Sequence, residues 1–540
     1  MQLHDLPSDV LRLVLEASFT TRYDATDTLK ANLPLLAVCR RWRYLVLAAV
    51  YSGVDICYGD SGRGSGSDDD HASSAPSEPD DAEITTNLDL VVSAGCVQTV
   101  KQMSITVYYR TNPFPGLDAV IRLMRGAAEE WRGVRQLDVS VLATGHLLGL
   151  RANAADHKAE IKQTSAALAA TMPGVCRVFF DSNYLGSAVQ EFGGRLAVLY
   201  SDQLESLLSR HPVIVPPDHT FGQLKRVSIE YGGVISYQHP RVDPARLVSL
   251  GLEWWPVDHS WAPFSADNGS KTIEFPSLKR LNVMYQPADV ADDAEAGCRD
   301  GRPWELHFPE LERLCVNCKQ DTCSLLEYAV LPAHMSVISI KAAAPVLVRV
   351  AEMGLPASQS LKITVSADTD GNPAALVAAN HILESAHESK ELELEVEDRL
   401  LPVLPESIAC TSLTVLAIWA NTNTDTMLRL IQMLPRLARL HVQSLTLGNT
   451  QEDISVPGPD ESRLVDPFNS SIEEMWIWAS PDEPAPEMLV LVAKYLLLKI
   501  PTLVYLRSAD ISERQITEFV DAYSKRYPHL ASIKHELGDY

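Results

Sequence analysis

The chain has 540 residues, of which 46% are hydrophobic, and a formal net charge of −24 at pH 7. An acidic chain of this kind lacks the excess of lysine and arginine with which proteins bind the phosphate backbone of nucleic acids. No run of about eighteen apolar residues is present, so we expect no membrane span. The first residues lack the basic and apolar regions of a secretory signal, and the nine cysteines are scattered and odd in number. We therefore expect reduced thiols and a location in the cytoplasm or nucleus.

The N-terminal stretch, residues 6–56, predicts two short amphipathic helices. The first helix has a leucine–proline pair followed by apolar residues at helical spacing, namely Leu6, Pro7, Val10, Leu13 and Val14. Proline suits a first helical turn, because that position makes no intrahelical hydrogen bond through its N–H group. The spacing then places the apolar residues on one face. Two helices of this size cannot bury both faces alone, so they need each other, the following domain or a partner.

The second predicted helix begins near residue 33 and contains the sequence VCRRWR at residues 38–43. Together with the leucine–proline start, this sequence resembles an F-box, whose second signature is hydrophobic-Cys-basic-x-Trp-basic. Asp9 stands where the family usually has glutamate, and residues 17–32 are longer and more polar than the family's middle helix.

The resemblance implies that residues 1–56 form an F-box-like helical module that docks to the Skp-type adaptor of a cullin–RING ubiquitin ligase. The residues expected to pack this module or to contact the adaptor are Leu6, Pro7, Val10, Leu13, Val14 and Trp42. The alternative is an ordinary helical cap at the start of a repeat array, which such arrays require.

Residues 59–83 have an abruptly different composition, rich in glycine, serine, aspartate and proline and without a large apolar residue. Such a segment cannot bury enough surface to offset the entropy lost on ordering, so we predict a disordered acidic insertion. An acidic tether, a phosphorylation segment and a plain surface insertion are the alternatives for its role.

A short pattern, apolar-x-x-apolar-x-apolar, recurs from residue 100 onward. Its copies begin at residues 100, 134, 175, 224, 247, 278, 311, 335, 413, 437 and 472, with looser or shorter copies from 361, 392 and 503. Three copies begin within nearly identical sequence segments, FPSLKRL at 275–281, FPELERL at 308–314 and LPRLARL at 434–440. The step from Leu278 to Leu311 is 33 residues, within the range of roughly 20–50 that marks repeat architectures.

Each copy of the pattern predicts a short strand, because its last two apolar positions are two residues apart and point to one face. Helical segments are predicted between the strands, at residues 117–131, 154–172, 374–387, 424–434 and 486–498. Alternating strands and helices give parallel strands with helices outside, and neighbouring units must stack because none buries its own apolar face.

The expected fold class is therefore α/β, and residues 84–540 resemble a leucine-rich-repeat solenoid of irregular repeat length. A final helix, capped at Ser512 and running to about residue 526, is expected to cover the end of the array. A set of doubly wound α/β domains is the alternative for this region.

The candidate catalytic and metal-binding motifs are weak. Cys315, Cys318 and Cys323 form a C-x2-C-x4-C group that could bind zinc. However, the first two lie three residues apart on a predicted strand and so face opposite sides, which favours Cys318 in the core and Cys315 on the surface. The sequence at 368–372 lacks the acidic positions of a calcium loop and is interpreted as a turn. Nucleophile elbows, zinc-protease helices and phosphate loops are absent, so we expect no enzyme, no cofactor and no metal.

The outward positions of the predicted strands are the candidate binding residues. Those expected to line one surface and to bind a protein substrate are Glu253, Trp255, Asn282, Met284, Trp419, His441, Trp476 and Trp478. Large aromatic side chains are costly to expose and are common interface anchors. The alternative is that insertions or neighbouring loops cover these tryptophans.

Together these features predict the substrate-recognition subunit of an SCF-type cullin–RING E3 ubiquitin ligase. Its expected partners are the Skp-type adaptor, the cullin scaffold and a protein substrate of unknown identity. The alternative function is a repeat scaffold for protein–protein interaction without a ligase role. An enzyme ranks third, because scattered histidine, serine and aspartate residues can always meet in a fold.

Overall fold

The computed structural model describes most of the chain after residue 51. The described residues are 52–59, 83–144, 154–182, 186–211, 213–216, 219–230, 241–255, 264, 272–285, 305–318, 325–326, 329–365, 388–396, 412–446, 454, 456–459, 461, 465–479, 486–508 and 511–536. The chain divides into two compact units, the first made of residues 1–253 and 261–268 and the second of residues 254–260 and 269–540. None of the described helices is both long and apolar enough to cross a membrane.

The first unit is built on a sheet whose strands are parallel, except for one antiparallel strand at its edge. In spatial order the strands are β2 (Ile84–Thr86), β1 (Gly53–Tyr58), β3 (Gln102–Tyr109), β4 (Gln136–Ala143), β5 (Arg177–Ser182), β6 (Ser206–Ser209), β8 (Arg226–Glu230) and β10 (Ser249–Trp255). The helices are α5 (Leu88–Ser93), α6 (Phe114–Ala127), α7 (Lys158–Thr171) and α8 (Ser187–Leu199). A small separate sheet pairs β7 (Thr220–Phe221) with β9 (Arg241–Val242).

The second unit repeats this plan with strands that are all parallel. In spatial order they are β12 (Arg280–Tyr285), β14 (Arg313–Cys318), β16 (His334–Ala342), β17 (Ala357–Val365), β18 (Glu391–Val396), β19 (Val415–Asn423), β20 (Arg439–Thr446), β21 (Glu474–Ala479), β22 (Tyr505–Arg507) and β23 (Lys534–Glu536). The helices are α10 (Ala344–Met353), α12 (Thr424–Met433), α13 (Pro486–Lys499) and α14 (Glu513–Tyr523). A second sheet joins β11 (Thr272–Glu274), β13 (Glu305–His307) and β15 (Ala329–Val330).

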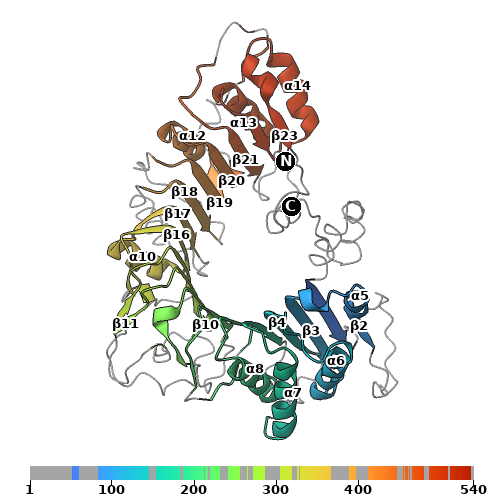
Figure 1. Ribbon diagram of the computed structural model, residues 1–540. Coiled ribbons are helices and arrows are strands. Elements are labelled where there is room, and N and C mark those ends of the chain that lie inside the picture. The colour runs from blue at the N-terminus through green and yellow to red at the C-terminus, as the bar shows by residue number, and fades with distance from the viewer. Residues whose placement is uncertain are drawn as a thin grey trace, which may run out of the picture. The chain divides into compact units, whose positions relative to one another are not determined.

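Within each unit the described helices cover one face of the sheet, and none of them lies on the other face, which we call the open face (Figure 1). The core lies between the sheet and the helices, and strand alternation places the apolar residues there. In β3, for example, Met103, Ile105 and Val107 are at most 1% exposed, whereas Ser104 and Thr106 between them are half-buried on the open face. The prediction of a mixed α/β fold with a large parallel sheet is therefore confirmed. Doubly wound sheets carry helices on both faces, which neither unit does among its described residues.

A ladder of backbone hydrogen bonds ties the starts of neighbouring strands together. The carbonyl of Lys101 accepts bonds from the N–H groups of Arg135 and Gln136 at 2.8 and 3.0 Å. The carbonyl of Arg135 accepts from the next pair, Cys176 and Arg177, at 2.9 and 3.0 Å. The same arrangement recurs at Cys176, Glu205, Lys225, Lys279, Glu312, Lys390, Thr414, Ala438 and Glu473. Because these bonds use only the backbone, the strand starts tolerate side chains of every kind.

The phenylalanines of the repeated FPSLKRL and FPELERL segments have a packing role in the second unit. Phe275 and Phe308 are 0% exposed, and their rings stack with centroids 5.1 Å apart. Each phenylalanine follows a short strand of the β11–β13–β15 sheet, so the shared sequence segment occupies the same place in two consecutive repeats. Leu434 occupies the position of these phenylalanines in the third copy and is 1% exposed.

The expected boundary of the helical module at residue 56 is wrong. Gly53–Tyr58 is strand β1, which pairs in parallel with β3, and Val54 and Ile56 are at most 1% exposed in the core of the first unit. Val54 and Ile56 stand at alternate positions, which suits a strand, and parallel pairing with β3 buries both of them. The rest of the module, residues 1–51, lies outside the described residues.

The acidic insertion also lies outside the described residues, apart from its two ends. Gly59 donates a backbone hydrogen bond to the carbonyl of Glu83 at 3.0 Å, and β1 and β2 on either side are antiparallel. The insertion therefore begins and ends at one place, at the end of a two-stranded hairpin. Gly59 has a φ of +86°, which a glycine adopts without strain.

The predicted helices near residues 117–131, 154–172, 424–434 and 486–498 are confirmed, with ends shifted by a few residues. The one predicted at 374–387 lies outside the described residues. Ser512 caps α14 as predicted, and its side chain exchanges hydrogen bonds with Gln515 in a capping box. Helix α14 ends at Tyr523 rather than near residue 526.

Candidate functional site

Five side chains gather on the open face of the second unit, on neighbouring strands. They are Trp419 on β19, His441 on β20, Trp476 and Trp478 on β21, and Arg507 on β22. We call Trp419, His441, Trp476 and Trp478 the tryptophan cluster. Four of the eight predicted binding residues are therefore brought together.

Strand alternation and register place the cluster on this face. Leu416, Ile418, Val442 and Ile477 are at most 2% exposed and lie in the core, so the residues between them point the other way. Parallel pairing aligns His441 with Trp476, and Trp476 with Arg507, at the same level of adjacent strands. The side chains are half-buried and together form one continuous surface.

The rings of the cluster contact one another directly. His441 stacks on Trp476 with centroids 4.4 Å apart and an interplanar angle of 22°. Trp478 lies 5.9 Å from Trp419 and 5.7 Å from Trp476, and Trp419 lies 6.4 Å from His441. The guanidinium of Arg507 lies 4.7 Å from the Trp476 ring centroid, in the range of a cation–π contact. Trp476 is thus held by contacts from both neighbouring strands.

The polar atoms of the cluster are unequally satisfied. The Trp476 Nε1–H group donates to Glu474 Oε1 at 2.7 Å. Trp419 Nε1 and His441 Nε2 are buried and have no hydrogen-bond partner among the residues that the structure describes. Buried polar groups without partners cost free energy and often mark functional sites rather than pure packing.

Burial lowers the pKa of His441 below its ordinary value, because the charged imidazolium loses contact with water. Glu474 and, more weakly, Glu393 act in the opposite direction, whereas Arg439 and Arg507 lower the pKa further. The imidazole is therefore neutral at neutral pH and behaves as part of the aromatic surface.

This pKa predicts a pH dependence of stability that His441→Phe should weaken. The unfolded chain binds the proton first, at a pKa of about 6.5, so the stabilising contribution is full above that pH and is lost as the pH falls toward the lower folded pKa. We expect the free energy of unfolding to fall more steeply below about pH 6.5 in the wild type than in His441→Phe. Urea unfolding across this pH range measures both slopes, and equal slopes would contradict the prediction. Burial also lowers the pKa of His211. Because His211 is present in both the wild type and His441→Phe, its contribution to the two slopes is the same.

Three glutamates on β18 stand beside the cluster, and we call Glu391, Glu393 and Glu395 the glutamate column. Leu392 and Leu394 between them are 2% exposed, which places the carboxylates on the open face. Lys362 on β17 lies 2.7 Å from Glu393 and 3.4 Å from Glu395. Lys362 therefore pairs with Glu393 and Glu395, whereas Glu391 is exposed. The opposite side of the column borders the cluster through the pair Glu395–Trp419.

The other predicted binding residues do not join the cluster. Asn282 is exposed and Met284 half-buried on β12, but β14, β16, β17 and β18 lie between β12 and β19. Glu253 is half-buried on β10 of the first unit, and the side chain of Trp255 lies outside the description. The predicted adaptor residues Leu6, Pro7, Val10, Leu13, Val14 and Trp42 lie outside the described residues.

The sequence reasoning missed Arg507 and the glutamate column. Their signal was present, because Glu391, Glu393 and Glu395 alternate with leucines, and Arg507 follows Leu506 at the outward position. Charged residues at outward positions are ordinary on a solvated sheet face, so only their placement beside the tryptophans makes them notable.

The cysteine pair behaves as predicted from strand alternation. Cys318 is 1% exposed in the core and Cys315 is exposed on the open face. Among the residues that the structure describes, no group of histidine, cysteine, aspartate and glutamate side chains is arranged to hold a metal ion. Cys323 and residues 368–372 lie outside those residues.

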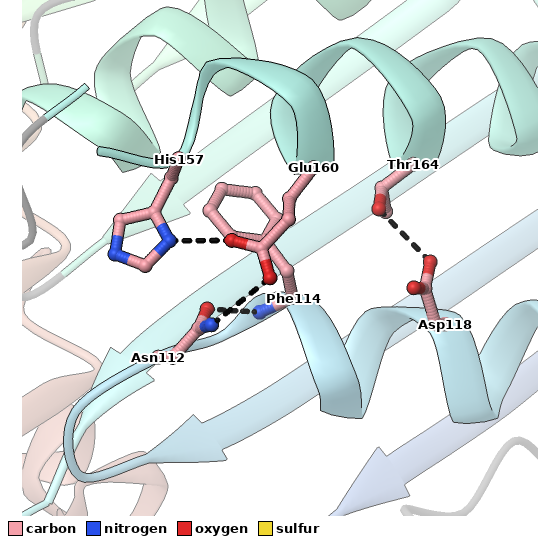
Figure 2. A network of polar contacts seen from close by, with 6 residues as sticks. All are labelled: Asn112, Phe114, Asp118, His157, Glu160 and Thr164. Atoms are coloured by element: carbon pink, nitrogen blue, oxygen red, sulfur yellow. Dashed lines mark hydrogen bonds and ion pairs between the residues drawn. The ribbon is translucent and has the colours of Figure 1, made fainter. Parts of the chain in front are cut away.

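A second polar network lies in the helical layer of the first unit, between α6 and α7 (Figure 2). His157 Nδ1 lies 2.5 Å from Glu160 Oε2, and Asn112 donates to Glu160 Oε1 at 3.4 Å. Thr164 donates to Asp118 at 2.9 Å rather than to His157, so the hydroxyl, imidazole and carboxylate do not form a nucleophilic triad. The network joins the starts of the two helices and has a structural role.

No protein-family profile matches the sequence, and a search of the curated proteins finds no match. The candidate site therefore has to be interpreted from its own chemistry. Its aromatic surface, charged borders and position on an open sheet face suit the binding of another molecule's apolar side chains.

Proposed function

We propose that this chain is the substrate-recognition subunit of an SCF-type cullin–RING E3 ubiquitin ligase. In this proposal residues 1–51 dock to the Skp-type adaptor, and the open face of the second unit binds a protein substrate. The chain does no chemistry itself. It raises the effective concentration of the substrate near the ubiquitin donor.

The observation that carries the binding half of the proposal is the tryptophan cluster. Three half-buried tryptophans lie together on one sheet face, and tryptophan is strongly enriched among the residues that dominate interface energies. The neighbouring charges on Glu393 and Arg507 provide the polar rim that surrounds such anchors.

We further propose that both sheets belong to a leucine-rich-repeat solenoid. Support comes from strands that follow chain order from β3 onward, from described helices that lie on one face, and from the backbone ladder that repeats at the strand starts. The F-box-like signatures at Leu6–Pro7 and residues 38–43 support the adaptor half.

The adaptor half predicts that a chain beginning at Ser52 loses the Skp-type adaptor while it keeps its fold. The deletion has to stop before Gly53, because β1 pairs with β3 and its loss would open the core of the first unit. Size-exclusion chromatography of purified chain with purified adaptor measures the complex. Trp42→Ala, a single change within the second signature, is the matched full-length variant.

We expect a complex with the full-length chain, a weakened complex with Trp42→Ala, and none with the chain beginning at Ser52. Equal binding by the shortened chain would place the adaptor contact elsewhere. If the adaptor forms no complex with the full-length chain either, the adaptor half of the proposal is wrong and the alternative, a repeat scaffold without a ligase role, is favoured.

A further inference from the structure

We propose that the tryptophan cluster and the glutamate column together bind an extended peptide segment that carries an apolar or aromatic anchor about three residues from a lysine or arginine. The inference rests on the proposed substrate-binding role of this face and names the chemistry of the segment. The anchor packs on the tryptophans, and the basic side chain reaches the carboxylates of β18.

The ring distances determine where the anchor lies. Centroids of the cluster are between 4.4 and 6.4 Å apart, so the rings pack against one another. A cation held in an aromatic cage would need to enter between rings, and at these separations the neighbouring ring already occupies that space. The cluster therefore offers the outer surface of a packed aromatic layer, which suits an apolar or aromatic side chain laid on top.

The charges place the basic residue on the β18 side. Of the glutamate column, Glu393 and Glu395 share the single ammonium of Lys362, and Glu391 is exposed. The neighbouring strand β19 presents Val415, Ala417 and Trp419 at the paired positions, none of which is charged. Among the residues that the structure describes, the column thus presents three carboxylates beside the aromatic layer and is ion-paired by the one ammonium of Lys362.

Among the described side chains, the opposite border carries two cations and one carboxylate, and that carboxylate, Glu474, already accepts a hydrogen bond from Trp476 Nε1–H at 2.7 Å. Arg507 lies over Trp476 at 4.7 Å, and Lys534 on β23 lies over the ring of Tyr505 at 5.3 Å. Because like charges are disfavoured at close range, a bound lysine or arginine points toward β18 and away from β22. This asymmetry gives the segment one direction across the strands.

The spacing of the strands determines the spacing in the peptide. The middle of the cluster is on β20, two strands from β18. Neighbouring strands lie about 4.8 Å apart, so the anchor and the basic group are separated by roughly 10 Å. An extended chain advances about 3.3 Å per residue, which makes this distance about three residues.

Selection from a display library of short random peptides on the immobilised full-length chain tests the inference. Selections run in parallel on the wild type, on Trp419→Ala/Trp478→Ala and on Glu391→Gln/Glu393→Gln. Circular dichroism melting confirms that all three chains are folded. We expect the wild type to enrich peptides with an apolar or aromatic residue about three positions from a lysine or arginine.

The two variants should lose different parts of that preference. The tryptophan variant should no longer enrich these peptides, and the glutamine variant should keep the apolar preference but bind the selected basic peptides about threefold more weakly, as expected for exposed charge pairs. Cluster-dependent peptides without a basic preference would overturn the inference and leave the proposed function standing. Peptides that bind the tryptophan variant equally, or no enrichment at all, would overturn both the inference and the substrate-binding role of the cluster.

Discussion

Replacing Gly194 with alanine should destabilise the protein by about 3 kcal/mol, the upper part of the range for overpacking a close-packed region. Gly194 lies in α8, where an added Cβ would overlap the backbone carbonyl of Ile214. That carbonyl belongs to a segment held against the helix by a hydrogen bond from Ile214 N–H to the carbonyl of Gln190 at 3.1 Å. Backbone cannot rotate away as a side-chain tip can, so the helix or the segment has to move. Urea unfolding measures the loss.

Gly126→Ala is the matched control, because it makes the same chemical change in another helix of the same unit. A Cβ at Gly126 in α6 meets nothing within 4 Å. Alanine there should gain stability, by up to about 1 kcal/mol from its higher helix propensity. A neutral result at Gly194, or equal effects at both positions, would show that α8 and residues 213–216 do not pack as described.

Replacing Trp419 and Trp478 together with alanine should abolish capture of the protein partner that full-length chain retains. Each side chain is a candidate interface anchor, and truncating such an anchor typically costs about 2–4 kcal/mol of binding free energy. One loss of that size already weakens Kd by a factor of about 30 or more. Quantitative pull-down followed by titration with the recovered partner measures the change.

Phe179→Ala provides the control for a general effect of removing aromatic area. Phe179 is also a half-buried ring on an open sheet face, contacted by the guanidinium of Arg210 at 5.6 Å, but it lies on β5 of the first unit. We expect it to leave partner capture unchanged. Loss of the partner with Phe179→Ala but not with the double tryptophan variant would move the binding site to the first unit.

The strands were predictable because the apolar residues in each copy of the pattern directly indicate which face of the strand is buried. Leu416 and Ile418 lie two residues apart, both enter the core, and Trp419 necessarily points outward. The same rule correctly separated Cys318 from Cys315. For this sheet, alternation alone therefore identified the residues available for binding.

Strand β1 was not predictable in the same way. Residues 53–58 carry one short alternation next to a stretch with helical spacing, and only pairing with β3 decides between the two structures. Similarly, the sequence gives no measure of how far apart outward residues lie. Met284 and Trp476 have the same local pattern, yet β12 and β21 are separated by many intervening strands.

The charges around the cluster also required the register. Glu395 becomes a neighbour of Trp419, and Arg507 of Trp476, only because parallel pairing aligns residues that are far apart in the sequence. Repeat lengths that vary along the chain hide this alignment. An asymmetric border of negative and positive charge was therefore visible only in the folded protein.

The most direct test of the central claim, that one chain holds an adaptor at its N-terminal segment and a substrate on the open face of its second unit, is affinity purification with quantitative mass spectrometry. Three chains are compared in one run, namely the full-length protein, the chain beginning at Ser52 and Trp419→Ala/Trp478→Ala. We predict two separate losses, in which the shortened chain loses the adaptor and cullin but keeps the substrate, and the tryptophan variant does the reverse. Retention of every partner by both altered chains would contradict the account.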